Sequence, residues 1–368
     1  MQAQRILTHT ADPSVNRIDG FEIAEPVAAG EVLLAVRRVA LTTNNITYAL
    51  FGERMQYWQF FPSGEAGWGI VPVWGFADVL ASRAEGLREG ERIYGYWPLA
   101  THLRVQAAQV SRGRFVDAVP HRAELPPIYN QYLRCAADPT YREHDEGALA
   151  IVKPLFTTAW LLADFFHEQH WCGARQLVIS SASSKTAYAT AWCARQLGGV
   201  QVVGLTSPAN LGFVRALGCY DRVLTYDTLA QLDAALPTVF ADYSGNAGQR
   251  ARLHHHVGAN LMRSAVIGAT QFSTGARDSG LPGAKPTFFF APEQGRRRAE
   301  AWGGAELQRR VGESQGAFLQ RALDPVAPWL QIESHEGLAV AQSLLARLAR
   351  GEVDPRGGHV VDIGSTHE

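Results

Sequence analysis

The sequence predicts an α/β protein with two domains: a doubly wound parallel sheet with helices on its faces, and a β-rich domain that forms a partly closed barrel. The first observation is a strand, a polar turn, a helix and a second strand within residues 177–205, which together make a βαβ unit. The second is a series of short apolar segments separated by glycines between residues 31 and 105, which is typical of barrels. The third is the length, because 368 residues can bury two cores.

Composition and charge narrow the possible partners. The formal net charge is −1, so no electrostatic argument favours nucleic acid or an anionic membrane. The four cysteines are scattered and form no C-x-x-C pair, which is typical of a reducing compartment and argues against a structural zinc lobe. No signal peptide and no uninterrupted apolar run of membrane-spanning length is recognisable. We therefore expect a soluble, cytoplasmic protein that binds neither nucleic acid nor membranes.

The barrel domain can be followed segment by segment. Residues 31–41 alternate between apolar and polar positions as a pair of strands would, and residues 42–52 then form a polar loop and a short helix. Residues 72–79 and 91–96 indicate two further strands, with a glycine-flanked turn at 86–90 between them. The pattern predicts several short strands joined by tight turns.

Two segments of this domain allow more than one interpretation. An aromatic cluster is either barrel core or the wall of a ligand pocket, since ligand sites are mostly apolar; its members are Tyr57, Trp58, Phe60, Phe61, Trp68, Trp74 and Phe76. Residues 117–145 are polar but contain too many aromatic residues for a disordered linker, so we expect an insertion or a lid.

The turn of the βαβ unit is the strongest candidate for a binding site. The apolar strand 177–179 runs into a polar turn at 180–184, and a helix then extends from Lys185 to the glycines at 198–199. Such a turn lies at the amino end of a helix, where unpaired N–H groups and the helix dipole favour an anion. The polar groups that we expect to face a nucleotide here are Ser181, Ser183, Ser184, Lys185 and Thr186.

The usual glycines of a dinucleotide fingerprint are missing from this turn, which leaves two other interpretations open. Lys185 and Thr186 end the turn as the last residues of a P-loop do, but Ile179 and Ser184 stand at its two glycine positions. A purely structural turn without a ligand is the other possibility.

Several segments resemble the medium-chain dehydrogenase/reductase superfamily, and they follow one another in the order of that superfamily. The segments are the loop that contains Asn44, Asn45 and Tyr48, the turn and strand at 86–95, the helix at 154–162, and the landmarks at 194–199, 217–221 and 242–245. The chain is most similar to the zinc-independent, quinone-oxidoreductase-like members, and in detail to a bacterial branch with the turn Ser-Ser-Ala-Ser-Ser-Lys-Thr. The resemblance implies a GroES-like catalytic domain at 1–152 and 325–368, and a Rossmann-type dinucleotide-binding domain at 153–324.

The later elements of the superfamily can also be assigned. Residues 286–292 indicate a proline-bounded edge strand, which relatives use to join two subunits, so we expect a homodimer. Residues 306–323 and 337–350 have helical periodicity, and residues 358–363 would return as a strand to the first domain.

No metal site is expected. In this superfamily catalytic zinc needs an early cysteine and a Gly-His-Glu motif, whereas residues 42–45 and 73–77 here contain neither cysteine nor histidine. The histidines at 254–256 are consecutive and therefore point in different directions, so we expect a solvated surface segment rather than a metal site.

The end of the second strand, at 200–205, indicates which dinucleotide the resemblance implies. An NAD site carries a carboxylate there to bind the ribose hydroxyls, but this chain has Thr206, Ser207 and Asn210. The missing acid favours NADP(H) over NAD. Ser244 and Gly245 follow a further strand at the position where relatives hold the nicotinamide side of the cofactor.

These residues predict a zinc-independent, NADPH-dependent oxidoreductase that transfers hydride to a carbonyl or an activated alkene of a small organic substrate. Without zinc the developing oxyanion needs a donor, and Tyr48 is the candidate, with Asn44 and Asn45 as orienting donors. A buried tyrosine bonded to backbone is the competing interpretation of Tyr48. Trp58, Trp74 and Tyr132 are expected to line the substrate pocket. The alternatives are a lyase or isomerase on the same fold, or a nucleotide-binding protein without catalytic activity.

Overall fold

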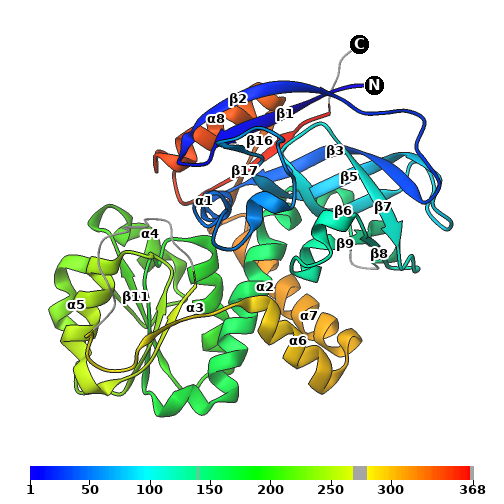
Figure 1. Cartoon of the computed structure of the whole chain (residues 1–368). Helices are drawn as coiled ribbons and strands as arrows, with labels where there is room; N and C mark the ends of the chain where they lie inside the picture. Colours follow the sequence, from blue (N-terminus) through cyan, green and yellow to red (C-terminus); the bar gives the residue numbers. More distant parts are fainter. Residues whose placement is uncertain (139–140, 268–279, 365–368) are drawn as a thin grey trace. The chain divides into compact units, whose positions relative to one another are not determined.

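The chain divides into two compact units in the computed structural model, which describes residues 1–138, 141–267 and 280–364 (Figure 1). Unit 1 contains Met1–Ile151 and Gln331–Glu368, and unit 2 contains Val152–Leu330. The chain thus leaves the first unit once and returns to it, with the crossings at 151/152 and 330/331, against 152/153 and 324/325 expected from the sequence.

Unit 1 is a β-barrel domain. Its eight-stranded sheet has the order β16-β17-β3-β5-β6-β9-β8-β7, and an additional pairing of β3 with β7 closes part of it into a barrel. A smaller sheet has the order β2-β1-β4. The elements are β1 (Gln2–His9), β2 (Asp12–Glu22), β3 (Glu31–Leu41), α1 (Thr43–Leu50), β4 (Trp68–Gly69), β5 (Pro72–Ser82), β6 (Arg92–Pro98), β7 (His102–Ala108), β8 (Arg114–Asp117), β9 (Gln131–Arg134), β16 (Gln331–Glu336), α8 (Leu338–Ala349) and β17 (Gly357–Asp362).

Strand β3 holds the barrel together, because it pairs with β5, β7 and β17. The sequence predicted a pair of strands at 31–41, and this prediction is wrong: the segment is one continuous strand. Its apolar residues are buried along most of its length, and it bends through register shifts against β5. A long strand with irregular pairing can contact neighbours at both of its ends, which is how a curved sheet closes.

The segment at 117–145 is part of the barrel wall and not a lid. Strand β9 comes from this segment and pairs with β6 and β8. Tyr132 on β9 is fully buried and stacks between Trp97 and Phe115, with ring centroids at 4.8 and 5.2 Å. The aromatic residues that argued against disorder here are therefore core residues.

At Gly75 on β5, the backbones of two barrel strands approach each other closely. A Cβ atom at this position would lie 2.0 Å from the carbonyl oxygen of Arg38 and 2.8 Å from the Cα atom of Val39, both on β3. The indole N–H of Trp97 donates to the Gly75 carbonyl at 2.9 Å. Only glycine leaves room for this pairing.

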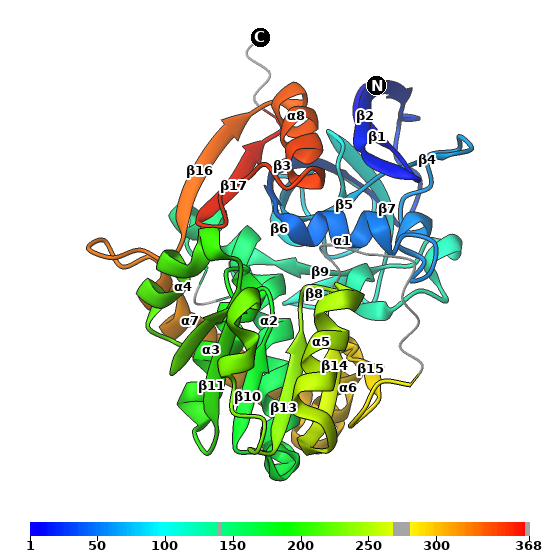
Figure 2. The ribbon, with the colours of Figure 1, turned by 90° about the vertical axis from the view of Figure 1, so that its left-hand side faces the viewer.

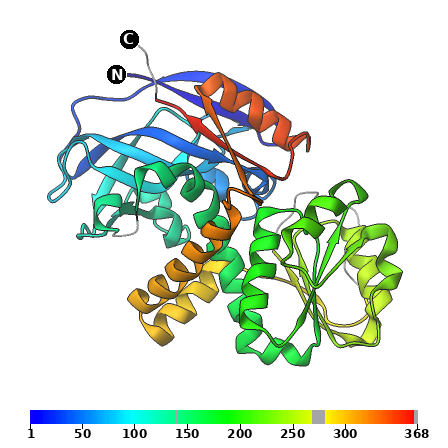
Figure 3. The same cartoon turned by 180° about the vertical axis from the view of Figure 1, so that it is seen from behind.

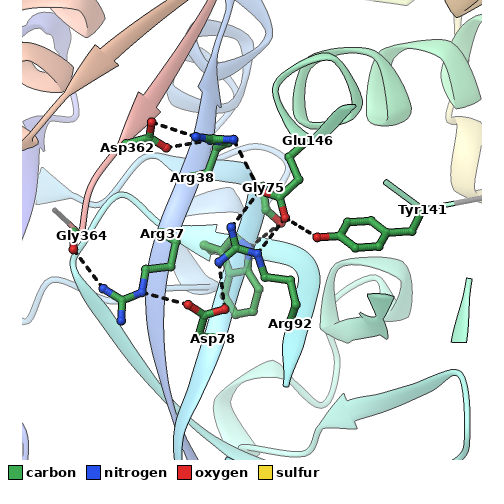
Figure 4. Close-up of polar contacts among 10 residues, drawn as sticks. Arg37, Arg38, Gly75, Asp78, Arg92, Tyr141, Glu146, Asp362 and Gly364 are labelled. Carbon is green, nitrogen blue, oxygen red and sulfur yellow. Dashed lines mark hydrogen bonds and ion pairs between the residues drawn. The ribbon is translucent and has the colours of Figure 1, made fainter. Parts of the chain in front are cut away.

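A network of charged side chains joins four strands to the start of helix α2 (Figure 4). Arg38 on β3 donates two hydrogen bonds to Asp362 on β17, at 2.7 and 3.0 Å. Arg92 on β6 donates to both carboxylate oxygens of Glu146 at 2.7 Å, and to Asp78 on β5 at 2.8 Å. The Glu146 side chain is fully buried, so loss of Arg92 would leave its charge with only the more distant Arg38, at 3.7 Å, and cost up to about 3–5 kcal/mol.

Unit 2 is a Rossmann-type domain. Its sheet is parallel throughout, with the order β12-β11-β10-β13-β14-β15. Helices lie on both faces, with α5 on one side and α3 on the other (Figures 1 and 2). The elements are α2 (Glu146–Glu168), whose first residues belong to unit 1, β10 (Gln176–Ile179), α3 (Lys185–Leu197), β11 (Gln201–Thr206), α4 (Leu211–Leu217), β12 (Arg222–Thr225), β13 (Thr238–Asp242), α5 (Ala247–Val257), β14 (Leu261–Val266), β15 (Pro286–Phe288), α6 (Ala291–Trp302) and α7 (Gly304–Ala322).

Helix α2 is the core helix of this unit. With the turn before it, Glu143–Glu168 is long and apolar enough to cross a membrane by length and composition, and 61% of its most apolar window is buried within the structure. Such burial is what a core helix of a folded domain shows. Arg298 on α6 pairs with Asp164 of α2 at 2.6 Å and lies over the ring of Trp302 at 4.4 Å, which fastens α6 to α2. Helices α6 and α7 lie side by side (Figure 3).

Strand β15 forms one edge of the parallel sheet. It is only three residues long and pairs with β14 alone. Phe288 at its end is 45% exposed, whereas the next residue, Phe289, is buried against Phe165. The predicted edge strand is therefore present, with one large apolar side chain open to solvent.

Candidate active site

Helix α1 places Tyr48, and its first turn is fixed by a capping box. The Thr42 hydroxyl accepts from the Asn44 N–H at 3.2 Å, and the Asn45 side-chain oxygen accepts from the Thr42 N–H at 2.7 Å. The Asn45 amide nitrogen donates to the Pro72 carbonyl at 2.9 Å. Asn45 was predicted as an orienting donor beside Tyr48, and in the structure its side chain fastens α1 to the start of β5.

The Tyr48 hydroxyl accepts a hydrogen bond from a nitrogen donor. The indole N–H of Trp74 on β5 donates to it at 3.0 Å, and the side chain of Asn44, one helical turn earlier, is close enough to lower the pKa of the phenol. A hydroxyl oxygen that accepts from a donor directs its own proton away from that donor. The geometry therefore leaves the Tyr48 O–H available to donate, and Tyr48 bonds side chains and not backbone.

Burial controls the ionisation of this phenol. Desolvation raises the pKa of Tyr48 well above its ordinary value of 10.0, and the neighbouring Tyr57 raises it further, against smaller opposing effects of Trp74 and Asn44. Tyr48 thus keeps its proton throughout the neutral range. It can act as a hydrogen-bond donor or an acid, but not as a base.

Three further tyrosines surround Tyr48, and we call the four together the phenol cluster: Tyr48, Tyr57, Tyr96 and Tyr129. Their rings lie 4.7, 5.5 and 6.5 Å from that of Tyr48. The hydroxyls of Tyr57 and Tyr129 are 3.3 Å apart. The Tyr96 hydroxyl is buried and has no hydrogen-bond partner among the described residues. A buried donor of this kind is costly unless a ligand satisfies it.

The three residues predicted to line the substrate pocket lie in different places. Trp74 belongs with the phenol cluster, since its ring lies 5.0 Å from that of Tyr96. Trp58 packs flat over two glycines, where a Cβ atom on Gly52 or Gly69 would come within 2.3 Å of the indole. Tyr132 lies in the barrel core, and its hydroxyl donates to the Tyr96 carbonyl at 3.2 Å. Of the three, only Trp74 is brought next to Tyr48.

In unit 2 the polar turn follows β10 and leads into α3, as predicted. Ser184 is the N-cap of α3 and accepts from the Ala187 N–H at 3.4 Å. Ser181 has a positive φ of 48°, and its N–H donates to the Tyr226 hydroxyl at 2.8 Å. The N–H groups of Ser183 and Thr186 have no partner within the described part of the chain. The N–H groups of Ser180, Ser181, Ala182 and Ser184 are therefore used internally, and those of Ser183 and Thr186 remain.

Strand β11 approaches this turn closely and ends beside it. A Cβ atom on Gly204 would lie 3.0 Å from Ala182 and from Tyr220, whose hydroxyl donates to the Ala182 carbonyl at 2.9 Å. At the end of β11, the Thr206 hydroxyl is buried and has no hydrogen-bond partner among the described residues. Gly204 thus allows the close approach of strand and turn that glycines in the turn itself would otherwise allow.

The remaining predicted residues border the same turn. Asn210 donates from its side chain to the Ser183 hydroxyl at 3.1 Å, and Ser207 is the residue before the short helical turn that contains Asn210. Lys185, the first residue of α3, is half-buried. The structure therefore brings the serines of the turn together with the end of β11, although the two segments are separated in the sequence by a helix.

Ser244 and Gly245 follow β13 and are organised by Asp242. One carboxylate oxygen of Asp242 accepts from the hydroxyls of Ser180 and Ser244 at 2.8 Å, and from the Gly245 N–H at 3.2 Å. The other oxygen pairs with Arg250 on α5 at 2.8 Å. This buried ion pair ties the ends of β10 and β13 to α5.

The histidines at 254–256 lie on helix α5, and the expectation of a solvated segment is wrong for the first of them. His254 is fully buried, with one ring nitrogen 3.0 Å from the Ser264 hydroxyl and the other 3.0 Å from the Pro282 carbonyl. The His256 ring nitrogen lies 2.8 Å from the Leu232 carbonyl, and His255 is exposed. The three side chains point apart, as expected of neighbours on a helix.

Sequence reasoning missed the tyrosines that complete both sites. Tyr226 and Tyr220 contact the turn from the far side of β11, and Tyr96 and Tyr129 complete the phenol cluster. Tyr96 could have been found, because it belongs to an aromatic stretch on a predicted strand. Tyr226 carries no signal in the sequence, since only the pairing of β11 with β12 brings it to the turn.

Several solved structures share this fold over nearly the whole chain. CurA from Vibrio vulnificus, in complex with NADPH, matches with a TM-score of 0.61 and 15% identity, covering 98% of this chain and 99% of that one. The yhdH oxidoreductase from Salmonella enterica, in complex with NADP, matches at 0.55 and 16%, covering 99% and 100%. The Etr1p/NADP/crotonyl-CoA complex matches at 0.59 and 13%, covering 98% and 100%. The predicted GroES-like plus Rossmann architecture is confirmed.

Within this fold, the chain belongs to the family described as "Protein of unknown function (DUF2855)", whose model matches residues 39–354. No curated protein matches the sequence.

Proposed function

We propose that the protein is an NADPH-dependent oxidoreductase that reduces a carbonyl or an activated alkene of a small organic substrate, without a metal at the reacting oxygen. The observation that carries this proposal is the Tyr48 hydroxyl, which accepts from the Trp74 indole and so presents its own proton. The fold supports it, because CurA and the yhdH oxidoreductase are bound to NADPH and NADP in their structures.

Unit 2 has the groups that NADP(H) needs. The N–H groups of Ser183 and Thr186 stand at the amino end of α3, where a pyrophosphate is favoured, and Lys185 adds a positive charge. The buried Thr206 hydroxyl would gain a partner from the adenosine ribose or its phosphate at the end of β11. No carboxylate stands at residues 206–210 to repel a 2′-phosphate. The donor set therefore fits NADP(H) better than NAD.

Bound NADPH would supply hydride, and the residues of unit 1 would supply the proton. As negative charge develops on the substrate oxygen, the Tyr48 O–H donates to it. The Trp74 N–H, together with the nearby Asn44 side chain that favours the charged form, stabilises the charge that passes to the phenol oxygen. The Tyr96 hydroxyl is a second donor in the same apolar surroundings. Residues 42–45 and 73–77 offer no cysteine or histidine ligand, which supports chemistry without zinc at this place.

The proposed protein is a homodimer and is cytoplasmic. The exposed Phe288 at the edge strand β15 supports a homodimer joined at this edge. The four cysteines are free thiols, and three of them are buried, which supports a cytoplasmic protein.

The variant Tyr48→Phe tests the catalytic part of the proposal, because it keeps the ring and removes only the donor. We expect unchanged NADPH affinity by calorimetry and a fall in turnover of about 10²-fold in NADPH oxidation with quinones or unsaturated carbonyls as substrates. Tyr188→Phe, which removes a fully buried hydroxyl in unit 2, is the control and should keep wild-type turnover. NADPH binding without oxidation of NADPH by any substrate would favour a lyase, an isomerase or a binding protein instead.

A further inference from the structure

Two histidines and a glutamate meet on the neighbouring strands β16 and β17 of unit 1. Glu333 and His335 are two residues apart on β16 and therefore point to the same face, and Glu333 is the direct register partner of His359 on β17. The three side chains each offer one ligand atom, and these atoms lie within 4.8 Å of one another. The strand pairing thus gathers two imidazoles and one carboxylate from two segments 24 residues apart.

The distances within this cluster match those between ligands of one metal ion. His359 Nδ1 lies 3.1 Å from His335 Nε2 and 3.3 Å from the nearer carboxylate oxygen of Glu333. In a tetrahedral zinc site with bonds of about 2.0–2.1 Å, neighbouring ligand atoms are about 3.3 Å apart. The third distance can close by rotation of Glu333, whose side chain is 47% exposed.

We propose that Glu333, His335 and His359 form a binding site for a divalent transition-metal ion of the zinc class. Two imidazoles and a carboxylate are a donor set that zinc prefers over calcium or magnesium, which take oxygen ligands. His359 is buried at 6% exposure and provides a fixed ligand, whereas Glu333 is reached from solvent. The fourth position is left for water, because no other histidine, cysteine or acid joins the group among the described residues.

The ion would fasten the edge of the large sheet. Strand β16 is the last strand of the sheet and pairs only with β17, and five of its six residues are exposed. One ion held by Glu333 and His335 on β16 and by His359 on β17 would link the two strands through their side chains, in addition to the backbone hydrogen bonds. The site shares no residue with the phenol cluster or the turn of unit 2, so it is independent of the proposed catalysis.

Metal binding by matched variants tests this proposal. Full-length protein is stripped with a chelator, the chelator is removed, and Zn²⁺ alone is titrated by calorimetry into the wild type, Glu333→Gln, His335→Gln and the control His255→Gln, which changes an exposed histidine on α5. We expect one Zn²⁺ per chain for the wild type and the control, and binding weakened at least ~10-fold in the other two, since changes even beyond the ligands cost that much.

A second readout separates ligand loss from damage to the fold. Zinc should raise the Tm of the wild type and of His255→Gln but not that of His335→Gln, while circular dichroism of all variants stays unchanged. Equal zinc affinity of the wild type, Glu333→Gln and His335→Gln would overturn the proposal, as would the absence of stoichiometric zinc binding by the wild type. Neither readout depends on NADPH or on a substrate.

Discussion

The Tyr226 hydroxyl accepts the N–H of Ser181 at 2.8 Å and so occupies one donor of the turn between β10 and α3. The tyrosine lies just beyond β12, two strands away in the sheet from the turn that it contacts. An anion that needs this N–H has to displace the phenol, which costs about 1 kcal/mol for an ordinary hydrogen bond.

Removal of this hydroxyl should therefore tighten NADPH binding. We expect Tyr226→Phe to raise the affinity by about 5-fold, the equivalent of roughly 1 kcal/mol, measured by calorimetric titration. Tyr220→Phe is the matched control, because the Tyr220 hydroxyl donates to the Ala182 carbonyl and competes with no anion. Weaker binding by Tyr226→Phe would instead make Tyr226 a ligand of the cofactor.

Substitution of Lys185 is a second test of whether the turn between β10 and α3 binds the cofactor. If its ammonium group interacts with the pyrophosphate, Lys185→Ala should weaken NADPH binding by about 1–3 kcal/mol. Lys285→Ala, at an exposed position before β15, should bind NADPH like the wild type. Titration with ATP belongs in the same experiment, since a preference for ATP over NADPH would favour a degenerate P-loop.

Trp74 should act on turnover through Tyr48. Trp74→Phe removes the N–H that donates to the phenol, so we expect turnover to fall by about 5-fold, the worth of one hydrogen bond, with KM unchanged. When Trp74→Phe is combined with Tyr48→Phe, it should lower turnover no further, because the hydroxyl to which the Trp74 N–H donates is already absent. Additive losses would show that Trp74 acts independently of Tyr48.

The pH dependence follows from the raised pKa of Tyr48. Burial keeps the acid form beyond the ordinary value of 10.0, so proton donation is present at neutral pH and is lost only above that value. Turnover should therefore show no alkaline decline from this group up to about pH 10. A decline near pH 8 that disappears in Tyr48→Phe would contradict the assignment.

Treatment with a chelator distinguishes a catalytic metal ion from a structural metal ion at the β16–β17 pair. Treatment with a chelator should leave the initial rate of NADPH oxidation at 25 °C unchanged, because the phenol cluster contains no metal ligand set, while it should lower the Tm through the site on β16 and β17. A loss of activity in proportion to the metal removed, restored by Zn²⁺, would refute chemistry without zinc.

The homodimer can be tested at the edge of the parallel sheet. Phe288→Asp places a charge at the exposed end of β15 and should convert a dimer to a monomer in light scattering at micromolar concentration. Val326→Asp, at a side chain that is 91% exposed and far along the chain from β15, should remain dimeric. A monomeric wild type would exclude the dimer at this concentration.

The fold could be predicted where local pattern and long-range pairing agree. The βαβ unit around Lys185 was recognisable because each part has a strong signal: an apolar run, a polar cap and a glycine stop. Strand β16 was missed because its residues are mostly polar and exposed, so it carries no alternation. The segment is extended because it pairs with β17, whose apolar residues are buried in the sheet.

The candidate site was predictable in part, for the same reason. Tyr48, Asn44 and Trp74 come together because a short helix and a strand follow each other closely, which the sequence indicates. The helix cap made by Asn45 was not predicted, because a side chain that caps its own helix looks like any polar residue in a loop. The meeting of Tyr226 with Ser181 depends on the sheet order, and no local pattern contains that information.

Gly75 bears on how this chain can change over evolution. It lies within 73–77, the segment where the sequence resemblance would place metal ligands, and any side chain at position 75 would force β5 away from the carbonyl of Arg38. A single substitution to histidine, cysteine or glutamate at this position would break the barrel pairing before it could bind an ion. Position 75 is thus closed to a metal ligand by single mutation, and a ligand could appear there only together with a change in the path of β3 or β5.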